Sequence, residues 1–138
     1  MDILVDALTT VISGLHKTIR RSFSDSSSFS LTELQTIALI NRNGKILPSE
    51  LATKTKITTP SMSQILKKME MRGIINRQSC DSDKRKVFIS LSKAGKDIVE
   101  QARFSRNEAL KTLIDARLNV DEIKILEQAL PILQKLNA

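Results

Sequence analysis

Four short segments in the middle of the chain limit the possible fold most strongly. Residues 48–52 begin a short helix with a proline, and a second helix over residues 60–73 begins with a proline and ends with a glycine. Residues 74–78 and 86–91 then have strand character, and residues 81–85 form a polar turn between them. The sequence therefore predicts two short helices joined by a tight turn, followed by a β-hairpin.

Longer helices are predicted on both sides of these segments. Apolar side chains recur every three or four residues from about residue 3 to 22, and the serine-rich residues 24–28 are expected to form a loop. A helix over residues 31–40 precedes the short segments. A long helix from about 93 to 114 and a last one from about 120 to 136 follow the hairpin. The predicted fold class is mainly α with a small β-hairpin wing.

Residues suited to capping helix N-termini precede three of these helices. They are Ser30 with Glu33 at the capping-box position, Thr58 or Thr59, and Asn119 or Asp121. Two short helices followed by a hairpin is the order of a winged helix-turn-helix.

At 138 residues the chain fits one domain, 1–138. We expect a winged helix-turn-helix head over 30–92 and dimerisation helices, called the arms below, over 1–23 and 93–138. The arms have wide apolar faces, which suggests packing from more than one side and hence a homodimer.

Charge distinguishes the head from the arms. Eleven basic and four acidic side chains lie between Arg42 and Lys86, so this block carries the whole net charge of +7. A basic block between neutral arms indicates a module that binds a polyanion, with nucleic acid as the first candidate.

Composition excludes several other classes. With four Phe and no Trp or Tyr, stacking on single-stranded bases is disfavoured. The single cysteine, Cys80, rules out an intrachain disulfide and a multi-cysteine zinc site. We find no catalytic set, metal site or cofactor site, and we expect Cys80 and the single histidine, His16, to be inert or structural. The N-terminus lacks a signal-peptide n-region and no apolar run could span a membrane, so we expect a cytoplasmic protein.

The helix over 60–73 carries the candidate reading face. If Met62, Ile65, Leu66 and Met69 point inward, seven polar or small residues lie on or beside the opposite face. They are Thr59, Pro60, Ser61, Ser63, Gln64, Lys67 and Lys68. Hydroxyl and amide groups suit base edges in the DNA major groove, where Gln64 could bind adenine bidentately, and the lysines suit phosphates.

At these residues the sequence resembles the MarR (multiple antibiotic resistance regulator) family of bacterial transcription factors. The matching segments are Leu51-Ala52, the helix from Pro60 to Glu70, Gly73-Ile74-Ile75-Asn76-Arg77, Asp81-Ser82-Asp83-Lys84-Arg85 and Leu91-Ser92-Lys93-Ala94-Gly95. The last two are similar to the family's Asp-x-Arg wing and its Leu-Thr-x-x-Gly, with Ser92 in place of Thr. Lys56 stands in a turn where the family often has glycine.

The resemblance places the family's wing arginine on Arg85 and implies that it reads or braces the minor groove, with Lys84 and Lys86 beside it. Asp83 would repel phosphate, so we interpret it as an organiser of the wing that pairs with Arg77 or Arg85. The resemblance also implies a dimer built from the arms, and a possible small aromatic or phenolic effector bound between head and arms.

Together these features predict a sequence-specific double-stranded DNA-binding transcriptional regulator. The resemblance further implies a ligand-responsive repressor that acts as a homodimer on a near-palindromic operator. The alternative is a winged-helix module whose basic head binds another protein or RNA.

Overall fold

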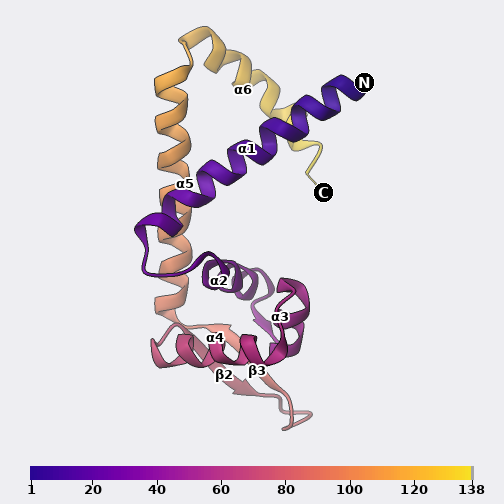
Figure 1. The fold of residues 1–138 in the computed structure, drawn as a ribbon, viewed down its shortest axis with the longest axis vertical. Helices are drawn as coiled ribbons and strands as arrows, with labels where there is room; N and C mark the ends of the chain where they lie inside the picture. The colour runs from indigo at the N-terminus through magenta and orange to yellow at the C-terminus, as the bar shows by residue number, and fades with distance from the viewer. Residues whose placement is uncertain (138) are drawn as a thin grey trace.

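A computed structural model describes residues 1–137 and, apart from residues 22–26, their side chains. The elements follow one another as α1 (Asp2–Ser26), α2 (Leu31–Asn43), β1 (Lys45–Ile46), α3 (Pro48–Thr55), α4 (Thr59–Met71), β2 (Ile75–Ser79), β3 (Val87–Leu91), α5 (Lys93–Arg117) and α6 (Val120–Gln134). Figure 1 shows the head at one end of the long α5 and α6 at the other end. Helix α1 crosses α5 between them. The predicted fold class, mainly α with a hairpin wing, is confirmed.

Helix α1 is longer than predicted. It continues through Ser26, so the expectation of a loop at residues 24–28 is wrong for 24–26. Serine costs only a few tenths of a kcal/mol in a helix relative to better formers, and extending a long helix is easier than starting one. The chain leaves the helix at Ser27, whose hydroxyl oxygen accepts a hydrogen bond from the Phe29 N–H at 3.3 Å.

Capping residues set the starts of the other helices. Ser30 and Glu33 form the predicted capping box, in which each side chain accepts a hydrogen bond from the other residue's backbone N–H. Of the alternatives left open by the sequence, Thr58 caps α4 and Asn119 caps α6. Lys56 ends α3 in the left-handed region, with φ of 57°, as its glycine-like position suggested.

The sheet has three antiparallel strands in the order β1-β3-β2. The hairpin that the sequence predicted is formed by β2 and β3, whose register pairs Ile75 with Leu91 and Ser79 with Val87. The sequence did not predict β1, which pairs Lys45 with Ser90 and so joins the turn after α2 to the wing. Two residues are too few to show a period of two.

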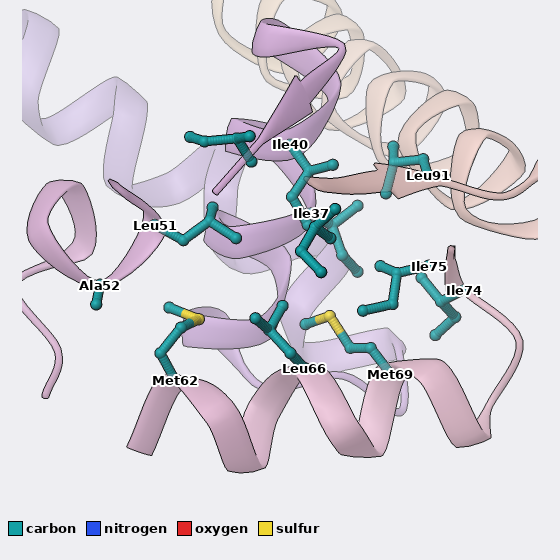
Figure 2. Close-up of a cluster of buried hydrophobic side chains, with 12 residues drawn as sticks. Ile37, Ile40, Leu51, Ala52, Met62, Leu66, Met69, Ile74, Ile75 and Leu91 are labelled. Carbon is teal, nitrogen blue, oxygen red and sulfur yellow. The ribbon is translucent and has the colours of Figure 1, made fainter. Parts of the chain in front are cut away.

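The core lies in the head, between α4, the sheet, α2 and α3. Figure 2 shows Met62, Leu66 and Met69 pointing from α4 toward Ile37 and Leu51, and all five side chains are fully buried. These three residues recur at spacings of four and three, so one face of α4 is held against the core and the opposite face is fixed outward. Ile65, predicted on the same inner face, is only partly buried.

The arms leave much of their apolar surface uncovered. Helix α1 packs on α5, yet large apolar side chains remain exposed along α1 and α6. On α1 they are Ile3, Leu4, Val5, Val11, Ile12 and Leu15, and on α6 they are Val120, Ile125, Leu126, Leu130, Ile132 and Leu133. Among the described residues, no helix combines the length and the apolar character that crossing a bilayer requires.

Candidate nucleic-acid interface

The outward face of α4 matches the predicted reading face. Thr59, Pro60, Ser61, Ser63, Gln64, Lys67 and Lys68 are all exposed. The anchoring of Met62, Leu66 and Met69 in the core causes this orientation. At the start of the helix the Thr58 hydroxyl donates a hydrogen bond to Ser61 Oγ at 2.9 Å, which orders the first turn of this face.

The two lysines of this face differ. Lys68 Nζ lies 3.6 Å from Oε2 of Glu33, which is buried at the start of α2. Burial raises the pKa of Glu33, but the hydrogen bond from the Ser30 amide and the Lys68 charge more than offset it, so the net pKa is lowered. Glu33 is therefore ionised at neutral pH, and Lys68 lies next to a carboxylate. Lys67 has no ion-pair partner within the described residues.

The wing presents three exposed cations at its tip, Lys84, Arg85 and Lys86. Asp83 Oδ1 accepts hydrogen bonds from the Arg85 backbone N–H at 3.0 Å and from Arg85 Nε at 3.1 Å. The Arg85 side chain and backbone hold the pKa of Asp83 below its usual value. Of the two partners proposed for Asp83 from the sequence, the structure has Arg85.

Arg77 does not pair with Asp83. Its Nε lies 2.9 Å from Oε2 of Glu70, near the end of α4. Arg77 is in the middle of β2, so this pair ties the base of the wing to α4 rather than ordering the wing tip. The spacing of charges along the sequence could not distinguish the two partners, because the choice depends on how β2 lies beside α4.

Two further basic residues, which the sequence analysis did not single out, make defined contacts in the structure. Lys45 Nζ lies 4.8 Å from the centroid of the Phe88 ring, which places a cation on the sheet beside the wing. Arg72 follows α4 and contacts the segment between α1 and α2. Pairing of Lys45 with Phe88 depends on β1, so the sequence carried no signal for it.

A pocket of about 500 Å³ lies between the head and the arms. His16 and Ile19 of α1, Leu34 and Ala38 of α2, and Val99 of α5 are among its lining residues. Five cationic side chains and His16 also line it, and no acidic side chain does so among the residues whose side chains the structure describes: Arg20, Arg42, Lys54, Lys56 and Arg106 are the cations. Three cations of the basic block, Arg42, Lys54 and Lys56, therefore border this pocket rather than the wing or the outer face of α4.

The site is connected to the arms through the motif around Ser92. The Ser92 hydroxyl donates to the Gly73 carbonyl at 2.6 Å and to the Ile74 carbonyl at 2.9 Å, and it accepts from the Gly95 N–H at 3.2 Å. One side chain thus caps α5 and fixes it to the turn between α4 and β2. The sequence analysis matched this motif to the family without assigning it a role. The hydrogen bonds of Ser92 give it one, the attachment of α5 to the head.

Comparison with known proteins places this arrangement in a family. The MarR family model matches residues 29–87. An HTH-type transcriptional regulator of Mycobacterium tuberculosis is 32% identical over 104 residues, which are 75% of this chain and 72% of that protein. The chain belongs to the MarR family. As a member of it, the chain is a transcriptional regulator and not an enzyme.

Solved structures share the whole MarR fold with this chain. A transcriptional regulator of Thermotoga maritima superposes with a TM-score of 0.82 at 17% identity, covering 99% of this chain and 94% of that one. A mutant of MarR from Escherichia coli, complexed with operator DNA, gives a TM-score of 0.61 at 21% identity, covering 98% and 94%. The arms as well as the head therefore follow the family fold.

Proposed function

We propose that this MarR-family regulator binds a specific double-stranded operator through α4 and the wing. The observation that carries this proposal is the fixed outward face of α4, where Ser63, Gln64 and Lys67 are exposed in a head that holds the net charge of the chain. A helix of this kind fits the major groove, and the E. coli relative bound to operator DNA supports the same use of the fold.

Residue roles follow from the contacts of each side chain. We assign base contacts to Gln64, with Thr59, Pro60, Ser61 and Ser63 at the groove edge, and phosphate contacts to Lys67. Lys68 joins the phosphate contacts only when its ammonium leaves Glu33. In the wing, Asp83 orients the Arg85 guanidinium toward the minor groove, where negative potential concentrates, and Lys84 and Lys86 contact the backbone.

The protein acts as a homodimer on a near-palindromic operator. The exposed apolar residues of α1 and α6 support this step, because surface of that extent on two neighbouring arms is covered in a stable protein. A two-fold dimer presents two heads to half-sites about one helical turn apart. A dimer seated on a promoter blocks transcription, so we propose a repressor.

The pocket between head and arms receives the effector. Five cationic lining residues, with no acidic one among the described side chains, favour an anion, and the Nε of Arg20 is buried without a hydrogen-bond partner in the described part of the chain. The aliphatic walls suit an apolar body. A small aromatic or phenolic acid has both properties, and its binding between head and arms changes the spacing of the two heads.

Selection of random duplex DNA on the purified full chain tests operator binding. We expect an enriched half-site motif, and Gln64→Ala to lose about 1–3 kcal/mol of discrimination at one position of it. Lys67→Ala should weaken binding evenly across sequences and reduce the salt slope by about one. Arg103→Ala on α5, outside the head, serves as the charge-matched control.

Two further measurements complete the test. Benzoate should bind to the protein more tightly than benzamide, the matched neutral control. Arg20→Gln should weaken the binding of benzoate and leave the binding of benzamide unchanged. Transcription from a promoter carrying the selected motif should fall when the protein is added. If random duplexes give no motif while single-stranded RNA or an acidic protein binds tightly, the head is an interaction module of the alternative class and operator binding is wrong.

A further inference from the structure

The short junction between α1 and α2 contacts the far end of α4. Ser28 Oγ accepts a hydrogen bond from an Arg72 terminal nitrogen at 2.9 Å, and the Arg72 guanidinium carbon lies 4.1 Å from the centroid of the Phe29 ring. Phe29 is itself partly buried against the head core. The guanidinium therefore stacks on the anchored Phe29 ring and donates a hydrogen bond to Ser28, the residue before it in the chain.

A second contact repeats this connection one helical turn earlier. Lys68 precedes Arg72 by four residues, so both side chains lie on the same side of α4. Lys68 faces Glu33, whose other carboxylate oxygen accepts from the Ser30 N–H at 2.9 Å. Residues 28–33 thus hold two successive turns of α4 by its exposed cations, outside the buried contacts of Met62, Leu66 and Met69.

Arginine is suited to this contact in a way that lysine is not. A planar guanidinium can stack on an aromatic face while its edge donates a directional hydrogen bond, whereas a lysine ammonium is a compact charge on a flexible stem. The Arg72 backbone N–H also donates to the Lys68 carbonyl at 3.1 Å, which closes the last turn of α4. The position of Arg72 is therefore fixed at both its backbone and its side chain.

We propose that Arg72 is a positioning residue that attaches the DNA-reading helix to the α1–α2 junction through Phe29 and Ser28. This rests on the proposed function of α4 in reading operator DNA. The core contacts fix which face of α4 points outward, and the junction fixes the tilt of its C-terminal half. Helix α1 lines the effector pocket with His16 and Arg20 and leads into this junction, so the contact links the pocket to the reading helix.

The first experiment needs no DNA. Amide hydrogen exchange is compared between wild type, Arg72→Lys and Phe29→Leu, two substitutions that keep the positive charge and the apolar character respectively. We expect faster exchange at the amides around 68–73 in both variants, with the amides of α2 and β3 unchanged. Arg103→Lys on α5 is the matched arginine control and should leave the exchange of α4 unchanged.

The second experiment compares the selected operator with a random duplex of the same length. Arg72→Lys should bind the operator several-fold more weakly and keep both its affinity for the random duplex and its salt slope, because the charge remains. Phe29→Leu should show the same pattern. The double variant should bind the operator no more weakly than either single variant, because both substitutions remove the same contact between Arg72 and Phe29.

Several outcomes would overturn the proposal. Arg72→Lys could bind the operator as tightly as wild type, or the two losses could simply add. If Arg72→Met weakens operator and random duplex alike and lowers the salt slope by about one, while Arg72→Lys restores both, Arg72 is a phosphate contact and not a positioning residue. If wild type selects no duplex, the proposed function fails, and unchanged exchange at 68–73 in both variants separately refutes the contact.

Discussion

Replacing Gly95 with alanine should destabilise the protein although alanine is the better helix former. Gly95 lies buried in the first turn of α5, and a Cβ built there overlaps the backbone carbonyl oxygen of Ile74. The same Cβ would lie 3.1 and 3.2 Å from two carbons of Leu91. A backbone oxygen cannot rotate away as a side chain can, so either α5 or β2 must move.

The magnitude follows from three contributions. Overpacking of a dense site costs about 1–3 kcal/mol. The Ile74 carbonyl also accepts from the Ser92 N–H and hydroxyl, both at 2.9 Å, and displacement of α5 weakens two bonds worth about 1 kcal/mol each. Alanine regains about 1 kcal/mol of helix propensity. If both bonds are lost, the net loss is about 2–4 kcal/mol, or a Tm lower by about 10 °C.

Urea unfolding followed by circular dichroism measures this change, at one fixed protein concentration because association would otherwise shift the midpoint. Gly14→Ala on α1 is the matched control. No described atom lies within 4 Å of a Cβ built there, so this variant should gain up to about 1 kcal/mol. A Gly95→Ala protein as stable as wild type would refute the argument that Gly95 allows α5 to approach the head.

Three other substitutions or titrations test separate features. Because the folded pKa of Glu33 is lowered, its contribution is complete above its unfolded pKa of about 4.3 and is lost as pH falls through the lower folded value. The free energies of unfolding of wild type and Glu33→Gln should therefore differ most above about pH 5 and converge in acid. Hydrogen bonding from Ser82 lowers the pKa of the Cys80 thiol, so maleimide should label wild type faster than Ser82→Ala at neutral pH, and equal rates would contradict this. Leu130→Glu, at a position 53% exposed on α6, should give a folded monomer by light scattering, and a persistent dimer would exclude this face from the interface.

The sequence was sufficient where a period or a cap determines structure locally. Met62, Leu66 and Met69 follow the helical period, so both the inner face of α4 and its outward residues could be predicted. The Ser30–Glu33 capping box is a contact within four residues and was equally readable. The end of α1 was not, because serine is compatible with both a helix and a loop.

The sequence was insufficient where contacts join distant elements. The partner of Arg77 is Glu70 and not Asp83, because β2 and α4 lie side by side in the packed head. Charge counting assigned no separate place to Arg42 and Lys54 within the basic block, and the structure places both at the pocket between head and arms. Distances across elements, rather than composition, separate these uses of the same residue types.

The three-stranded sheet determines which part of the wing can change in evolution or by engineering. Paired positions end at Ser79 and Val87, and β1 holds the opposite end of β3, so the base of the hairpin is fastened from both sides. One more backbone hydrogen bond, from the Cys80 N–H to the Lys86 carbonyl, follows this ladder, and residues 81–85 beyond it contribute nothing to the buried core. The length and composition of this tip can therefore vary with little cost to folding, which makes it the place where a regulator of this design can acquire a new operator preference.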